Sequence, residues 1–100
     1  MGTWHLYLIR TRYGALYAGI ATDVARRMAQ HEQSRRSGAK YLRAKAPLAL
    51  VYQARLGSRS LALRAEHSLK KLPKKEKEKI VAAAPSGPEL LSLLGIVPED

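Results

Sequence analysis

The segment HLYLIRTRYGALYAGIATDVARRMAQH, residues 5–31, largely decides the fold of this chain. The residues from 3 to 10 are rich in aromatic and β-branched types, which favours a strand. TRYG at 11–14 has the composition of a turn, and ALYAGI at 15–20 predicts the strand that returns. The segment therefore begins with a predicted β-hairpin.

The rest of the chain predicts further elements of a small α/β sheet flanked by helices. Thr22 or Asp23 can cap the helix that follows the hairpin. The later elements are a helix over 23–33, a basic loop over 34–46, a strand over 47–56, a helix from 57 or 58 to 72, a helix that starts near Pro73 and a weaker helix over 85–95. The expected order is β-β-α-β-α-α, in one domain over 1–100 with its core at about 3–83 and a C-terminal extension over 84–100.

Composition narrows the classes of function. Eighteen Lys and Arg against eight Asp and Glu give a net charge of +10, which is typical of a partner of nucleic acid. The alternative is a charge that serves only solubility. The absence of cysteine excludes disulfides and thiolate metal sites. We find no apolar run of about 18 residues and no signal peptide, so we expect a cytoplasmic protein without a membrane span.

The two tyrosines of the hairpin raise the question of a polar site. If the hairpin is centred on Arg12, Tyr7 lies directly opposite Tyr17 on the same face of the sheet. A register shifted by one residue would place the two side chains on opposite faces. Tyrosine also favours strands for packing reasons alone. Both a cluster of phenols and ordinary packing are therefore consistent with this pattern.

The first helix places two side chains beside its buried stripe. Val24 and Met28 define that stripe, and Arg27 and His31 form an i, i+4 pair on one border of it. Arg26 points nearly the opposite way, toward solvent. A border arginine either extends harmlessly to water or presents a fixed guanidinium to a cleft.

The second predicted helix carries one carboxylate on the border of its core face. The core positions are Leu61, Ala65, Leu69 and Leu72. Glu66 falls beside them, half-buried in a strongly basic protein. Such a carboxylate either forms a structural ion pair, the commoner outcome, or binds a metal ion.

Basic residues gather in two runs. The first comprises Arg26, Arg27, Arg35, Arg36, Lys40, Arg43 and Lys45. Tyr41 lies within this run, no acidic residue follows Glu32 there, and we expect it to contact phosphates. The second comprises Lys70, Lys71, Lys74, Lys75, Lys77 and Lys79. Contact of Lys70 and Lys71 with nucleic acid and an ordinary solvated helix face are equal alternatives for this second run.

The segment over 5–31 resembles the opening motif of the GIY-YIG nucleases. HLY at 5–7 stands where that family has GIY, and YAG at 17–19 stands where it has YIG. Arg27 lies ten residues after the second tyrosine, as in the family. His31 follows at a position that is tyrosine or histidine in the family.

The resemblance extends to the later helix and to a small stand-alone bacterial subgroup. RSLALRAEHSLKKL at 59–72 is similar to the family's later helix, whose glutamate matches Glu66. GAKYLR, PLALVY and KKLPKKEKEK also resemble the small subgroup, so the likeness covers residues 4–81. The chain departs from the family in having His5 and Leu6 for Gly and Ile and in containing no asparagine. We expect no appended DNA-binding domain, so the chain's own basic surface or a partner protein would supply specificity.

The resemblance implies a three-stranded antiparallel sheet flanked by helices and a metal-dependent hydrolysis of phosphodiesters. In that family scheme each residue has a role: Tyr7 and Tyr17 organise the nucleophile, Arg27 stabilises the phosphoryl charge, His31 shuttles a proton, Glu66 holds Mg²⁺ or Mn²⁺, and Gly19 allows close packing.

Two main hypotheses follow. The first is a monomeric endonuclease that acts on DNA in preference to RNA and recognises its structure rather than its sequence. The second is a nucleic-acid-binding module that keeps the nuclease fold but has no useful activity alone. An ordinary soluble domain whose basicity is incidental is the third.

Overall fold

The computed structural model describes residues 2–33 and 47–98 of the chain. Within them, three strands form one antiparallel sheet in the order β2-β1-β3, so the predicted α+β fold is confirmed. The strands are β1 (Trp4–Arg10), β2 (Leu16–Ala21) and β3 (Ala49–Gly57). The helices are α1 (Val24–Gln33), α3 (Arg59–Lys70), α4 (Lys74–Ala83) and α5 (Gly87–Leu93). The predicted basic loop over 34–46 lies outside the described residues.

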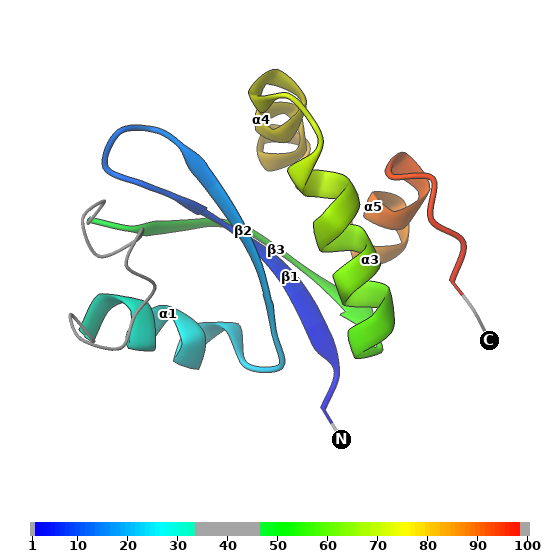
Figure 1. The fold of residues 1–100 in the computed structure, drawn as a ribbon, viewed down its shortest axis with the longest axis horizontal. Helices are drawn as coiled ribbons and strands as arrows, with labels where there is room; N and C mark the ends of the chain where they lie inside the picture. Colours follow the sequence, from blue (N-terminus) through cyan, green and yellow to red (C-terminus); the bar gives the residue numbers. More distant parts are fainter. Residues whose placement is uncertain (1, 34–46, 99–100) are drawn as a thin grey trace.

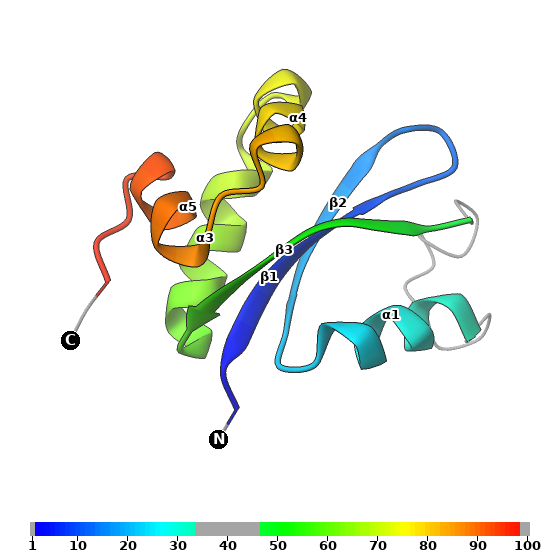
Figure 2. The same cartoon turned by 180° about the vertical axis from the view of Figure 1, so that it is seen from behind.

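The sheet separates two hydrophobic clusters. Figures 1 and 2 show α1 on one side of it and α3, α4 and α5 on the other. Side chains alternate along the central strand β1, so that Leu6 and Leu8 pack toward α3 while Tyr7 and Ile9 pack toward α1. All four are buried because β1 is covered on both faces.

The register of the hairpin differs from the expected one. Tyr7 pairs with Gly19 and Ile9 pairs with Tyr17, so the hairpin is centred on position 13 rather than on Arg12. The predicted direct opposition of Tyr7 and Tyr17 is therefore wrong. The partner of Tyr7 has moved by two residues, which preserves the face of a strand. Both tyrosines consequently still lie on the α1 face, as diagonal neighbours.

Helix caps explain where two of the helices begin. Asp23, rather than Thr22, accepts a hydrogen bond from the backbone of Arg26 at 3.0 Å and starts α1. Ser58 accepts one from the backbone of Leu61 at 3.1 Å and starts α3. No helix in the described ranges is long and apolar enough to cross a membrane.

The core face of α3 differs slightly from the predicted one. Ala62, Ala65 and Leu69 are fully buried, whereas Leu61 and Leu72 are only partly buried. The buried stripe of α3 therefore includes position 62 in place of the predicted position 61. The small alanine side chains at 62 and 65 let the helix pack close to the sheet.

The last helix belongs to the main core. Leu90, Leu91 and Ile96 are buried in the same cluster as Leu6 and Leu8. The core therefore includes residues of the segment over 84–100, beyond the boundary at 83 that the sequence indicated. A capping box of Ser86 and Glu89 begins α5, a favourable local signal for this short helix.

Candidate active site

Tyr7 lies at the centre of the α1 face of the sheet. Its side chain is almost fully buried, at 2% exposed, and its phenol crosses β2 at Gly19. A Cβ atom at position 19 would overlap the Tyr7 hydroxyl group. Because Gly19 has no side chain, the phenol extends across β2 toward the open edge of the sheet.

His31 brings a proton acceptor to this phenol from α1. The imidazole is buried, and its Nε2 lies 3.4 Å from the Tyr7 hydroxyl oxygen. The ring of Tyr17 meets the same imidazole edge-on, with ring centroids 6.4 Å apart. The helix therefore closes over both tyrosines and holds His31 between them.

The electrostatics of Tyr7 connect it to the other predicted residues. Burial raises the pKa of Tyr7 above its ordinary value, and the Arg27 guanidinium opposes this rise through a hydrogen bond and its charge. The charges of Tyr17 and Glu66 raise the same pKa further, by smaller amounts. Tyr17, Arg27 and Glu66 are therefore near enough to Tyr7 to affect its ionisation.

The pKa of His31 moves in the direction that keeps the ring neutral. Burial lowers this pKa below its ordinary value of 6.5, and the positive charge of Arg27 lowers it further. The imidazole is therefore neutral at pH 7 and can accept a proton.

Exposure does not distinguish the two neighbouring arginines of α1. Arg26 and Arg27 are both exposed, which fits the solvent-facing position predicted for Arg26 and both alternatives left open for Arg27. The difference lies in contacts. Arg27 acts on Tyr7 and His31, and its Nη1 donates to Gln30 at 3.3 Å. The side chain of Arg27, in the first turn of α1, is long enough to reach the site while its guanidinium stays accessible to a substrate.

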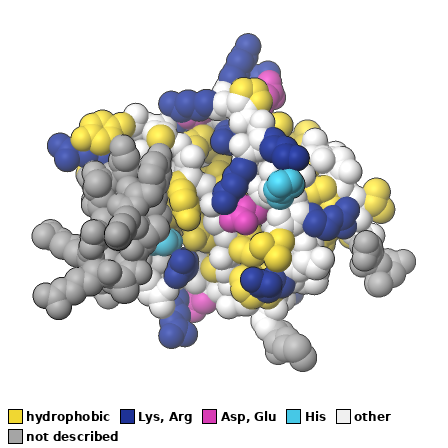
Figure 3. All heavy atoms as spheres, in the orientation of Figure 1, with side chains coloured by type: hydrophobic (Ala, Val, Ile, Leu, Met, Phe, Trp, Pro, Cys, Tyr) yellow, Lys and Arg dark blue, Asp and Glu magenta, His cyan; other side chains and the backbone are white. Residues whose placement is uncertain are grey.

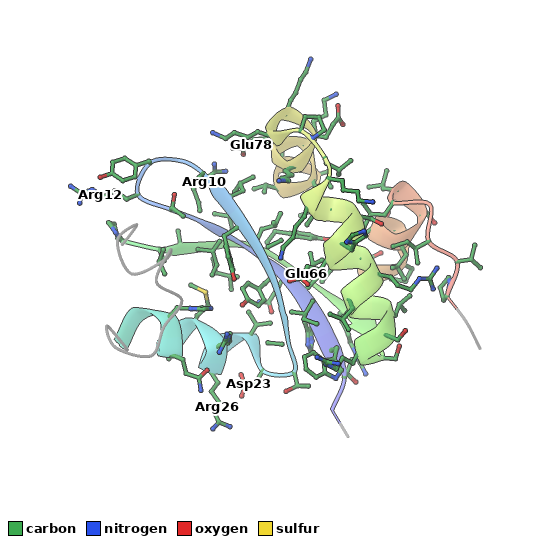
Figure 4. All side chains as sticks on the ribbon, in the orientation of Figure 1. Arg10, Arg12, Asp23, Arg26, Glu66 and Glu78 are labelled. Atoms are coloured by element: carbon green, nitrogen blue, oxygen red, sulfur yellow. The ribbon has the colours of Figure 1, made fainter. Side chains whose placement is uncertain are left out.

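Glu66 approaches the site from α3, on the other side of strand β2. Figure 4 shows its carboxylate beside the sheet, and its side chain is 19% exposed. Lys70 Nζ lies 3.5 Å from this carboxylate, which is the ion pair expected as one alternative. The carboxylate also acts on Tyr7. The ion pair with Lys70 therefore leaves Glu66 in the group that we name the tyrosine cluster, which comprises Tyr7, Tyr17, Arg27, His31 and Glu66.

The residues fit a divalent metal ion only in combination with substrate. In the described ranges no three His, Asp or Glu side chains gather into a ready metal cage. Glu66 is a single, partly exposed carboxylate at the rim of the site. Mg²⁺ is commonly held by one or two carboxylates, with water and substrate phosphate as the remaining ligands. Glu66 suits that kind of binding.

Two hollows flank the cluster. The first, which we name the edge groove, has a volume of about 300 Å³ and is lined by Trp4, Ile20, Ala21, Thr22, Asp23, Arg26, Arg27 and Gln30. The second, of about 420 Å³, is lined by Leu63, Arg64, Glu66, His67 and Lys70. Arg27 thus faces one hollow and Glu66 the other, and Figure 3 shows basic side chains around an acidic one on this face.

The predicted phosphate contacts fall into two groups. Arg35, Arg36, Lys40, Tyr41, Arg43 and Lys45 lie outside the described residues. Lys70 and Lys71 lie exposed at the end of α3, Lys70 beside Glu66, and their contact with nucleic acid stays a prediction.

Sequence reasoning missed one pair of side chains near the site. Trp4 lines the edge groove, and the Arg59 guanidinium lies over its indole at 5.6 Å. The two residues are far apart in the chain and share no motif. No local pattern could have joined them.

The comparison with known families agrees with this geometry. The sequence profile of the GIY-YIG catalytic domain matches residues 3–79, which include every member of the tyrosine cluster. The chain belongs to the GIY-YIG family. GIY-YIG domains are nuclease domains and act on nucleic acid.

Bacterial relatives of this GIY-YIG chain are of similar length. UPF0213 protein YE0453 of Yersinia enterocolitica is 53% identical over 93 residues, which cover 93% of this chain and 92% of that protein. UPF0213 protein YhbQ of Escherichia coli is 53% identical over 94 residues, covering 94% and 92%.

Two solution structures share the fold. UPF0213 protein BH0048 from Bacillus halodurans has a TM-score of 0.54 at 30% identity, covering 95% of this chain and 99% of that one. Protein EF2693 from E. faecalis has a TM-score of 0.58 at 29% identity, covering 83% and 86%.

Proposed function

We propose that this chain is a metal-dependent nuclease that hydrolyses phosphodiester bonds of DNA and selects its substrate by structure rather than by sequence. The observation that carries the proposal is the convergence of Tyr7, Tyr17, Arg27 and His31 at one edge of the sheet, with Glu66 at the rim. Arg27, Tyr17 and Glu66 affect the ionisation of Tyr7, and His31 lies within hydrogen-bond reach of its hydroxyl group, which supports a single reacting centre at Tyr7.

The buried phenol and the imidazole form a path for a proton. A water molecule beside Tyr7 gives one proton to the phenol oxygen while Tyr7 passes its own proton to Nε2 of His31, 3.4 Å away. This direction follows from the pKa values. Burial disfavours a lasting phenolate at Tyr7, whereas the lowered pKa leaves His31 neutral and ready to accept. The resulting hydroxide attacks phosphorus, the P–O bond to the ester oxygen breaks, and that oxygen leaves as an alkoxide that takes a proton from solvent. His31 then returns its proton to solvent.

Charge on the phosphoryl group requires cationic partners. Arg27 is exposed to the substrate side and yet belongs to the tyrosine cluster, so its guanidinium can donate to phosphate oxygens during attack. Mg²⁺ or Mn²⁺ held by Glu66 would supply Lewis acidity and stabilise the leaving oxygen. Tyr17, edge-on to His31, keeps the imidazole in place.

Structure selectivity follows from the type of contact available. The arginines and lysines around the site reach phosphates, which carry no sequence information. Selection among DNA molecules then depends on which of them can bring a backbone to the sheet edge. Branched, flapped or single-stranded DNA does so more easily than a continuous duplex, because its backbone bends freely.

The test is a cleavage panel of single-stranded, duplex, nicked, flap and branched DNA together with RNA. Each substrate is incubated with Mg²⁺, Mn²⁺ or EDTA. Glu66→Gln is expected to abolish cleavage. Glu76→Gln is the matched control because Glu76 also pairs with a helical lysine, at 3.3 Å from Lys79, but on α4. Cleavage by Glu66→Gln at the wild-type rate would refute the metal assignment.

A nucleic-acid-binding module without activity is the second candidate. It is favoured by the ion pair between Lys70 and Glu66, since the lysine occupies a carboxylate that a metal ion would need. This candidate predicts binding of the same substrates with no cleavage under any metal condition. Lys70→Ala separates the two candidates: it speeds metal-dependent cleavage or leaves it unchanged in a nuclease, and it creates no cleavage in a binding module.

A further inference from the structure

We infer that the edge groove binds one nucleotide next to the cleaved phosphate, with its base stacked on Trp4 and its phosphate on Arg26. This inference rests on the proposed function, because it assigns a subsite to the same substrate. The occupant is a nucleotide of a single strand or a frayed end. An internal base of an intact duplex is stacked on both faces and has none to offer.

The first observation is the aromatic platform. Trp4 is partly buried, and it lines the groove from the α3 side of the sheet. The Arg59 guanidinium over its ring fixes the indole from α3. A rigid aromatic surface beside cationic groups is the combination that single-strand binding proteins use, because every base has a face to stack.

The second observation is the charge of the groove. Arg26 and Arg27 line it against a single acidic side chain, Asp23. The Asp23 carboxylate already accepts a hydrogen bond from the backbone of Arg26 as a helix cap. Figure 4 shows Arg26 extending away from the protein at the end of α1 that begins beside Asp23. The groove therefore has a net positive charge, and Arg26, unlike Arg27, has no role in the tyrosine cluster.

The third observation is continuity with the reacting centre. Arg27 lines the edge groove and also acts on Tyr7 and His31. Trp4 and Ile20 lie on the α3 side of the sheet and Arg27 lies on α1, so the groove curves around the edge strand β2. A strand held by Arg27 at the cleaved phosphate thus enters the groove with its neighbouring nucleotide.

The chain provides a matched control for the platform. Tyr13 at the hairpin tip also lies under an arginine, with the Arg12 guanidinium 5.5 Å from its ring, and it is 67% exposed. It is not among the residues that line the groove. If any aromatic with an adjacent arginine sufficed, Tyr13 would bind a base as well as Trp4.

Trp4 is the single tryptophan of the sequence, so its fluorescence reports on the groove alone. The full chain is titrated in EDTA with a six-nucleotide oligodeoxythymidylate. We expect quenching of the fluorescence and protection of Trp4 from iodide. In parallel, the anisotropy of a dye-labelled oligonucleotide measures affinity. Trp4→Ala and Arg26→Ala are each expected to weaken binding about fivefold or more, while Tyr13→Ala changes it less than about twofold.

Trp4→Phe keeps an aromatic ring and guards against misfolding of the alanine variant; it is expected to bind more tightly than Trp4→Ala. Unchanged fluorescence and iodide access when the oligonucleotide binds would overturn the inference, as would equal effects of Trp4→Ala and Tyr13→Ala or the absence of binding. These binding measurements are made in EDTA and do not depend on cleavage. Stacking on Trp4 without cleavage of any substrate would refute the proposed nuclease activity but not the subsite. Cleavage without any response of Trp4 would refute the subsite but not the nuclease activity.

Discussion

A side chain on the neighbouring strand, rather than backbone conformation, requires glycine at position 19. Gly19 pairs with Tyr7 across the hairpin, and the phenol occupies the space that a Cβ would take. The sequence predicted a common face for the tyrosines correctly, because a shift by two residues preserves the face. It could not predict the partner of Tyr7, because the hydrogen bonds of the turn at Thr11 and Gly14 fix the register.

Gly19→Ala is expected to lower the rate of cleavage about 100-fold, because the added methyl group displaces the Tyr7 hydroxyl from His31. Binding of DNA in EDTA should stay close to that of wild type. Gly95→Ala is the control: its Cβ meets no neighbour, and its φ of +70° makes alanine strained, so it costs stability without touching the site. A wild-type rate for Gly19→Ala would contradict the placement of Tyr7.

The pH dependence of stability tests the neutral state of His31. Its pKa in the folded chain is lowered below 6.5 by burial and by Arg27. The unfolded chain therefore binds more protons between the two values, and stability falls as the pH drops from about 7 through 6.5 and below. We expect wild type to lose more Tm than His31→Gln between pH 7.5 and pH 5. Parallel losses in the two proteins would show that His31 keeps an ordinary pKa.

At the scale of elements, α5 shows what local sequence can and cannot reveal. The capping box of Ser86 and Glu89 is visible in the sequence and marks the start of a helix. The sequence also shows apolar residues at 90 and 91. It does not show that Gly87 approaches the backbone of β3, where a Cβ would overlap the carbonyl oxygen of Arg55. Tertiary packing alone decides that contact.

Gly87→Ala is expected to reduce the free energy of unfolding by about 1–3 kcal/mol, because the methyl group forces α5 away from a rigid backbone carbonyl. Thermal or urea unfolding followed by circular dichroism measures the loss. Ser92→Ala, on the exposed side of α5, should leave stability almost unchanged. If the two variants unfold alike, α5 does not dock closely on β3.

A second long-range contact attaches α4 to the sheet. Arg10 on β1 donates two hydrogen bonds of 2.7 Å to the carboxylate of Glu78. The hydrogen bond from Arg10 holds the pKa of Glu78 below its ordinary value of 4.5. The stabilisation is therefore present above about pH 4.5 and is lost as the pH falls through the lower folded value.

We accordingly expect Glu78→Gln to lower Tm by a few degrees at pH 7, because a bidentate pair with a fixed arginine is replaced by a neutral amide. The difference from wild type should shrink progressively as the pH falls below 4.5. Glu76→Gln, whose partner is a single exposed lysine, serves as the control. A difference that persists unchanged in acid would mean that packing rather than charge attaches α4.

At the scale of the whole molecule, the sequence predicted the sheet, the helices and the cluster of five polar residues, because each depends on local periodicity or on a motif. It did not predict the Trp4–Arg59 contact or the Arg10–Glu78 pair, which join distant positions. Of the two predicted alternatives for Glu66, the ion pair is present, with Lys70, while metal binding stays a prediction. The carboxylate also acts on Tyr7. The effect of Glu66 on Tyr7 joins α3 to β1, which no local pattern in the sequence reveals.

The net charge of +10 offers a last test, between a charge that binds DNA and one that serves solubility. If binding neutralises phosphates, the logarithm of affinity for duplex DNA falls linearly with the logarithm of salt concentration, by about 0.9 for each phosphate. Four to six contacts would give a slope of roughly −4 to −5 between 50 and 200 mM NaCl in EDTA. A slope near zero would leave the charge with no role in binding.

Substitution of Lys71 tests how far the DNA-contacting surface extends along the chain. It is exposed just after α3, whereas Lys79 on α4 is partnered by Glu76 at 3.3 Å. Lys71→Ala should reduce the slope by about one unit, because one counterion fewer is released, while Lys79→Ala should leave it unchanged. Equal reductions by both variants would extend the DNA contact over α4. No change in either would confine it to α1 and the residues that follow it.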